Sequence, residues 1–334
     1  MVADGFIGTL EKSLKEGKVS MQDIDTACRR MLEAKYKLGL FEDPYKYCDT
    51  LRTREKLYTA EHRSSARTIA TETFVLLKND HHLLPLDIKG KIALIGPMAD
   101  ARNNMCGMWS MTCTPSRHGT LLEGIRSAAG DKAEILYAKG SNIYYDAETE
   151  KAATGIRPLE RGDNRQLLDE ALRIAARADV IVAALGECAE MSGESPSRTN
   201  LEIPDAQQDL LKALVKTGKP VVLLLFTGRP LILNWESEHI PSILNVWFGG
   251  SETGDAVADV LFGKAVPCGK LTTTFPRSVG QLPLFYNHLN TGRPDPDNRV
   301  FNRYASNYLD ESNEPLYPFG YGLSYTDFVY GDLQ

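Results

Sequence analysis

Residues 178–204 read ADVIVAALGECAEMSGESPSRTNLEIP, and this stretch decides how the chain folds. Its first part, Val180 to Leu185, is an apolar run with the length and β-branched content of a strand buried on both faces. The run stops at Gly186, and an acidic loop rich in Ser and Gly follows. A helix is predicted from Asp205, directly after Pro204. The loop therefore follows the carboxyl end of a strand, where open α/β sheets bind ligands.

The loop carries three carboxylates, Glu187, Glu190 and Glu194, and each is a candidate for catalysis. Most glutamates on a protein surface are simply solvated, so the pattern alone selects none of them. The neighbours Ser192-Gly193 and Ser195-Pro196 are small or rigid, and such residues let a loop present one side chain outward. This favours Glu194, with Glu190 and Glu187 as rivals.

Apolar runs and amphipathic helices alternate on both sides of this stretch. Strands are predicted at residues 91–95, 133–137, 180–185, 220–226 and 242–246, with an edge strand at 271–275. Helices are predicted at residues 121–129, 164–177, from 205 onward and at 253–262. Repeated βα units imply a three-layer α/β/α sandwich over about residues 73–278, with a mostly parallel, six-stranded sheet and residues 180–185 in a central strand.

The two ends of the chain do not follow this alternation. Two helices are predicted before residue 40, the second capped by Ser20 and ending at Gly39, and another helix is predicted over 53–70. After Pro276 the chain is dominated by loops, with a short strand-like run at 326–330. A long loop in a compact domain is typically functional or packed against a neighbour.

Composition excludes several classes of protein. Of 334 residues, 43% are hydrophobic and 25% charged, as in ordinary soluble proteins. The net charge of −6 and the absence of a Lys/Arg cluster argue against nucleic-acid binding. No apolar run reaches the ~18 to 20 residues of a membrane span. The first residues lack the basic and apolar regions of a signal peptide.

The cysteines and the nucleotide-type motifs predict no cofactor or metal. None of the six cysteines forms a CxxC pair, and no zinc-like spacing of His and Cys is present. Free thiols are expected for most of them, although an oxidising compartment remains open. The strand KIALIGPMAD, residues 91–100, lacks the GxGxxG fingerprint, and neither GxxxxGK[ST] nor GxSxG occurs.

Four stretches together resemble glycoside hydrolase family 3, the β-glucosidase and β-xylosidase type. They are KIALIGPMAD at 91–100, the SGE loop with the downstream R-x-N-L-x-I-P at 192–204, WFGGSETGDAVADVLFGKAVPCGKLTTTFPRS at 247–278, and PLYPFGYGLSYTDF at 315–328. The opening helices also resemble the end of that family's barrel domain. The subgroup that the chain resembles most is the periplasmic bacterial β-glucosidases.

The resemblance implies a division into domains. Residues 1–60 would be the last helices of a (β/α)8 barrel plus a linker, 61–290 the α/β sandwich, and 291–334 a long loop and the start of a fibronectin-type-III-like domain. A whole barrel needs about 250 residues, so we expect a C-terminal fragment that lacks most of it. The family's nucleophilic aspartate lies in a Ser-Asp or Thr-Asp motif on the barrel, and Asp4, within Ala3-Asp4-Gly5, is not assigned that role.

The resemblance also implies a mechanism. The family hydrolyses β-linked sugars with retention, which needs a nucleophile and a general acid/base with carboxyl groups ~5–5.5 Å apart. The SGE loop makes Glu194 the general acid/base. The partners would be a β-linked oligosaccharide or glucoside and the barrel in the same protein, which would be periplasmic or secreted. The isolated chain, with an acid and no nucleophile, is expected to be inactive.

Some alternatives stay open. Arg198 either holds the loop or touches substrate, and holding the loop is favoured. Trp247 is either a core residue or a platform for a sugar ring, and the core is favoured. The alternative function is a non-catalytic carbohydrate-binding or interaction module on the same fold, which would bind sugar by itself.

Overall fold

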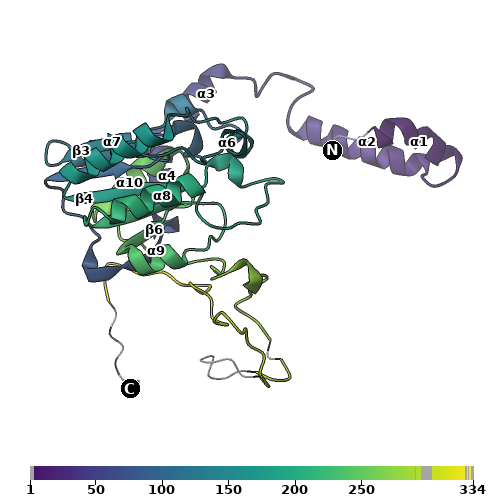
Figure 1. Cartoon of the computed structure of the whole chain (residues 1–334). Helices are drawn as coiled ribbons and strands as arrows, with labels where there is room; N and C mark the ends of the chain where they lie inside the picture. Colours follow the sequence, from purple (N-terminus) through teal and green to yellow (C-terminus); the bar gives the residue numbers. More distant parts are fainter. Residues whose placement is uncertain (1–3, 290, 295–302, 328, 330, 332–334) are drawn as a thin grey trace. The chain divides into compact units, whose positions relative to one another are not determined.

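The structure of the protein, a computed structural model, describes residues 4–289, 291–294, 303–327, 329 and 331. The chain divides into two compact units, residues 1–62 and 63–334. The second unit holds the sheet, which Figure 1 shows between layers of helices.

The first unit consists of helices whose ends are encoded locally. They are α1 Gly5–Lys15, α2 Met21–Lys37 and α3 Thr50–Lys56. Ser20 caps α2, because its Oγ accepts the N–H of Asp23 at 3.1 Å while the Asp23 carboxylate accepts the N–H of Ser20 at 3.0 Å. The two helices predicted before residue 40 are confirmed.

The single helix predicted over 53–70 is wrong, because two helices share this region. Helix α3 ends at Lys56, and α4 runs over Ala60–Thr73. Between them Tyr58 has a φ of 59°, which a continuous right-handed helix does not allow. The Thr59 hydroxyl accepts the N–H of His62 at 3.2 Å and so caps the new helix.

The sheet has six strands in the order β1-β6-β5-β4-β2-β3. Their bounds are β1 Val75–Asn79, β2 Lys91–Ile95, β3 Glu134–Ala138, β4 Val180–Gly186, β5 Val221–Phe226 and β6 Ser242–Asn245. All neighbouring strands are parallel except β1 and β6. Strand β4 lies between β2 and β5, so the prediction of a central strand at 180–185 is confirmed.

The edge strand predicted at 271–275 is wrong. The backbone N–H groups of Leu271 and Phe275 donate to the carbonyls of Tyr321 and Tyr317 at 2.8 and 2.9 Å, so this stretch pairs with the C-terminal segment and not with the sheet. The sixth strand is instead β1, which directly follows α4 and was not predicted.

Alternate residues of each strand enter two separate cores, as the pleat of a strand requires. On β4, Val182 and Ala184 face the core formed with α5 Leu121–Ala129 and α10 Thr253–Leu261. Ile181 and Ala183 face the core formed with α7 Asn164–Arg177 and α8 Asp205–Val215. The helix layers on the two sides of the sheet are visible in Figure 1, so the three-layer α/β/α sandwich is confirmed.

Two short helices, α6 Ala147–Thr154 and α9 Asn234–His239, were not predicted. Neither is long enough to show helical periodicity of its apolar residues. Among the helices of the described residues, none combines the length and apolarity needed to cross a membrane.

The described residues after Pro276 form loops, as predicted, together with one 3-10 helix, Val279–Gln281, that was not predicted. The C-terminal segment packs on the sandwich through tyrosines: the Tyr325 hydroxyl donates to the Val260 carbonyl at 2.7 Å, and that of Tyr321 to the Leu77 carbonyl at 3.1 Å. Part of the strand-like run predicted at 326–330 lies outside the described residues.

Helix α9 carries a buried carboxyl that links stability to pH. Glu236 is 3% exposed, and burial raises its pKa from 4.5 to about 7, with a further contribution from Glu202. The folded state binds the Glu236 proton more tightly than the unfolded state does, so protonation of Glu236 stabilises the fold. This stabilisation is complete below pH 4.5 and is lost as the pH rises through about 7.

We therefore expect Glu236→Gln to raise the free energy of unfolding at pH 8 by roughly 3 kcal/mol, since one pKa unit corresponds to about 1.4 kcal/mol. At pH 4 the difference from the wild type should vanish. Urea denaturation at both pH values measures it. Glu238→Gln, an exposed site on the same helix, is the control and should change little. Equal effects of Glu236→Gln at pH 4 and pH 8 would contradict the prediction.

Candidate functional site

The acidic loop begins where β4 ends, at a position that requires glycine. Gly186 has a φ of 126°, and a Cβ on it would lie 2.0 Å from the carbonyl oxygen of Phe226. The side-chain amide of Gln207, on α8, accepts the Gly186 N–H at 2.8 Å and donates to the Gly186 carbonyl at 2.9 Å. The path of the chain into the loop is therefore fixed on both sides.

Glu187, the first carboxylate of the loop, is fully buried and is held by charge. Its Oε1 lies 2.9 Å from Arg198 Nη1 and 3.0 Å from Arg229 Nε. Its Oε2 accepts hydrogen bonds from the Thr227 hydroxyl at 3.0 Å and the Gly228 N–H at 3.1 Å. A buried carboxylate with all these partners is a structural anchor.

The two arginines extend from this anchor along the loop. Arg198 donates from Nη2 to the Glu202 carbonyl at 2.8 Å, which confirms the favoured interpretation that it holds the loop. Arg229, which the sequence analysis did not single out, donates to the carbonyls of Met191 and Pro196. Through these two arginines, carbonyls from both halves of the loop are connected to Glu187.

Glu190 also points inward. Its side chain is 10% exposed, and its Oε1 lies 3.2 Å from Nε of Arg157. The same guanidinium donates to the carbonyl of Gly107. Glu190 therefore connects the acidic loop to two other segments of the chain, 107 and 157.

Glu194 differs from both rivals. It is exposed, and among the described residues no hydrogen bond or ion pair involves its carboxylate. The residues on either side of it have left-handed backbones, with φ values of 115° at Gly193 and 71° at Ser195. Such a conformation is uncommon for serine and is often found at functional sites. The backbone therefore presents Glu194 outward, while Glu187 and Glu190 are held inside.

A neighbouring loop supports Gly193 and places an indole beside it. A Cβ on Gly193 would lie 2.5 Å from Met108 Cγ and 3.6 Å from Trp109 Nε1. Trp109 is 72% exposed, so much of its indole is open to solvent beside Gly193, the residue before Glu194. Trp109 was not among the residues predicted from the sequence, although an indole within the short motif CGMWSM at 106–111 could have indicated an exposed aromatic side chain on a loop.

Trp247 has the structural role that was favoured. It is half-buried and packs against the core that contains Phe275, with 6.2 Å between the two ring centroids. The Trp247 ring therefore completes the core on the side of the sheet that α7 and α8 cover.

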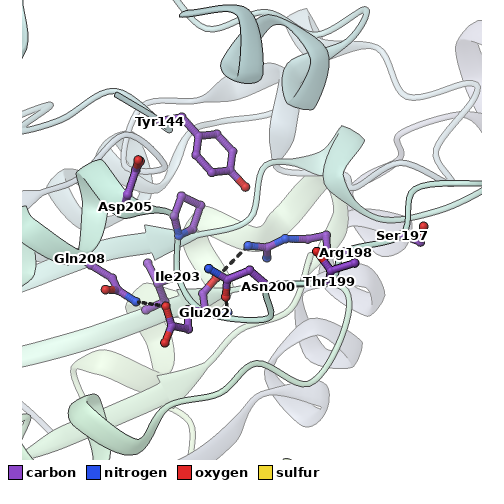
Figure 2. A pocket seen from close by; sticks show the side chains of 10 residues that line it. Tyr144, Ser197, Arg198, Thr199, Asn200, Glu202, Ile203, Asp205 and Gln208 are labelled. Atoms are coloured by element: carbon purple, nitrogen blue, oxygen red, sulfur yellow. Dashed lines mark hydrogen bonds between the residues drawn. The ribbon is translucent and has the colours of Figure 1, made fainter. Parts of the chain in front are cut away.

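A cavity of about 370 Å³ lies beside the second half of the acidic loop (Figure 2). In it, the Glu202 carboxylate accepts a hydrogen bond from Gln208 at 3.4 Å, and Arg198 reaches the Glu202 backbone. Its lining residues are Tyr144, Ser197, Arg198, Thr199, Asn200, Glu202, Ile203, Pro204, Asp205 and Gln208. Glu194 does not line this cavity, so the exposed carboxylate and the cavity are different features of one loop.

The cysteines are mostly free, as predicted, but one pair is not. Cys28, Cys48, Cys188 and Cys268 are free thiols, whereas Cys106 and Cys113 form a disulfide. Among the described residues, these two sulfurs and His118 are also the one group of three or more His, Cys, Asp or Glu side chains whose ligand atoms lie close enough together to hold a metal ion.

The sequence matches a family profile over residues 74–325, that of the glycosyl hydrolase family 3 C-terminal domain. The periplasmic β-glucosidase of Salmonella typhimurium is 47% identical over 96% of this chain, and a β-xylosidase of Formosa agariphila is 37% identical over 96%. The chain spans 42% of the length of each of these two relatives.

Solved structures give the same result. The β-glucosidase of Listeria innocua in complex with isofagomine superposes with a TM-score of 0.82 at 38% identity, covering 98% of this chain and 43% of that one. A mutant of the same enzyme has been solved in complex with laminaribiose, with a TM-score of 0.82.

Proposed function

Because the chain belongs to glycosyl hydrolase family 3 and contains that family's C-terminal domain, we propose that it supplies the general acid/base of a retaining, β-glucosidase-type glycoside hydrolase. The observation that carries this proposal is the contrast within one loop. Of its three glutamates, Glu187 and Glu190 are paired with arginines and turned inward, and only Glu194 is exposed without a partner among the described residues.

The proposed chemistry has two steps. In the first, the Glu194 carboxyl gives its proton to the glycosidic oxygen while a nucleophile attacks the anomeric carbon. In the second, the Glu194 carboxylate takes a proton from the water that hydrolyses the glycosyl-enzyme. The nucleophile comes from the barrel that the family resemblance implies, so the site is completed by a second domain in the same protein. The proposed domain bounds remain 1–60, 61–290 and 291–334.

The relatives support the substrate class and the compartment. Those named above are β-glucosidases and a β-xylosidase, and one is periplasmic. We therefore assign β-linked oligosaccharides or glucosides as substrates, and the periplasm or the exterior of the cell as the compartment. In such an oxidising compartment the Cys106–Cys113 pair is expected in its disulfide form unless a thiol reductant acts on it.

The division of labour predicts that the purified chain folds but does not hydrolyse p-nitrophenyl β-glucoside above the rate in buffer. A chimaera in which this chain replaces the matching part of the Salmonella typhimurium periplasmic β-glucosidase should be active, because it has both carboxyl groups. Release of nitrophenol measures both. Hydrolysis by the isolated chain that is abolished by Glu194→Gln would show that the chain also holds the nucleophile.

Calorimetric titration of the isolated chain with glucose and cellobiose tests the alternative function. We expect no measurable heat of binding, because most of the sugar-binding surface belongs to the barrel. Saturable binding would favour a non-catalytic carbohydrate-binding module.

A further inference from the structure

The loop between β2 and α5 brings together two sulfurs and an imidazole. Cys106 and Cys113 are half-buried and joined by a disulfide, and His118 is 4% exposed. The Nε2 atom of His118 lies 3.6 Å from Cys106 Sγ and 3.4 Å from Cys113 Sγ. One ring nitrogen therefore faces both sulfurs.

The two S–N distances match those expected in a thiolate–imidazole metal site. Zinc binds sulfur at about 2.3 Å and histidine nitrogen at about 2.0 Å, and a tetrahedral angle between such bonds separates S from N by about 3.5 Å. Both observed S–N distances are close to this value. Only the two sulfurs, now bonded to each other, would need to move apart.

The second nitrogen of His118 supplies an independent observation. Nδ1 lies 3.2 Å from the carbonyl oxygen of Gly119. A carbonyl only accepts, so Nδ1 is the donor in this contact, and in the neutral ring Nε2 then has the lone pair that a metal ion needs. Metal-binding histidines are oriented in this way by a hydrogen bond from their other nitrogen.

We propose that the Cys106–Cys113 disulfide is reversible and that its reduced form, with His118, binds a thiophilic divalent cation such as Zn²⁺. Reduction is a thiol–disulfide exchange with a small thiol or a dithiol protein: the S–S bond breaks, each cysteine gains a proton, and the reductant leaves as its own disulfide. Metal binding then releases the two thiol protons. Three protein ligands leave a fourth position for water.

The site lies next to the loop that carries Glu194. Met108, between the two cysteines in sequence, packs against Gly193. The carbonyl of Gly107 accepts a hydrogen bond from Arg157, the partner of Glu190. A change at the sulfurs therefore occurs one residue contact away from the proposed acid/base loop.

The test uses the whole chain with the exposed free thiols removed by Cys28→Ser, Cys48→Ser and Cys268→Ser. Reduced protein titrated with Zn²⁺ against a chromophoric chelator should bind one equivalent, and the oxidised protein should bind none. With Co²⁺, the reduced protein should show thiolate-to-metal charge-transfer bands and the d–d bands of a tetrahedral site.

In the same background, His118→Ala should weaken Zn²⁺ binding by at least about tenfold, and Cys113→Ser should abolish the cobalt charge-transfer spectrum of a two-thiolate site. His82→Ala, at an exposed histidine, is the control and should change nothing. The circular dichroism of each variant checks that it is folded. Reduced protein that binds no Zn²⁺, or that binds it equally well after His118→Ala, would overturn the proposal.

Discussion

Replacing Glu194 by alanine in the chimaeric enzyme should slow cellobiose hydrolysis by about 10²–10⁴-fold, the usual contribution of general acid–base catalysis. A sugar alkoxide is a poor leaving group and needs the proton that Glu194 donates. Dinitrophenolate leaves without a proton, so formation of the glycosyl-enzyme from a dinitrophenyl β-glucoside should be slowed far less. Steady-state rates with the two substrates measure the difference.

Azide should restore the second step of Glu194→Ala with the dinitrophenyl substrate. A small anion fits the space left by the carboxylate and attacks the glycosyl-enzyme without a general base. The product should be β-glucosyl azide, whose retained configuration is read by NMR. Because Glu194 is exposed and unpaired among the described residues, its removal should leave the rest of the loop in place.

The variants Glu187→Ala and Glu190→Ala are the controls for this assignment. Both remove a carboxylate of the same loop, but each of these carboxylates is paired with arginine. Neither variant should show a selective loss with poor leaving groups or formation of the azide. Azide rescue of Glu190→Ala, and not of Glu194→Ala, would show that the acid/base was assigned to the wrong glutamate.

The central part of the fold was predictable because it is encoded by local periodicity. The strands from 91 to 246 and helix 164–177 have apolar patterns long enough to be read, and each was found close to its predicted bounds. Strand β1 was missed because its apolar residues directly follow a helix, and its partner β6 is distant in sequence. The stretch 271–275 alternates like a strand, but its backbone pairs with the C-terminal segment.

The site was predictable only as far as the loop itself. The sequence favours Glu194 through its small neighbours, but it does not show why the rivals are excluded. That reason is tertiary: Arg229 and Arg157 come from other parts of the chain to pair with Glu187 and Glu190. Trp109 likewise reaches the site only through the packing of one loop on another.

Replacing Glu187 by alanine should destabilise the isolated chain by about 3–5 kcal/mol, the cost of removing one partner from a buried ion pair. The side chains of Arg198 and Arg229 are only 12% and 19% exposed. Without Glu187 their charges would lie side by side with little water to solvate them. Urea denaturation measures the loss, and the double variant with Arg198→Ala should lose less than the sum of the single variants, because one unpaired charge is then removed as well.

Glu194→Ala in the same denaturation experiment is the matched control, and it should change the free energy of unfolding by no more than about 0.5 kcal/mol, as at ordinary surface positions. The two glutamates of one loop should therefore give opposite results. Glu187→Ala should lower the stability and show no azide rescue, because Glu187 acts on the loop and not on the substrate. Glu194→Ala should remove the general acid–base contribution to catalysis and leave the stability unchanged. A loss below about 1 kcal/mol for Glu187→Ala would mean that the paired arginines reach solvent easily, and the loop would then be held by its backbone alone.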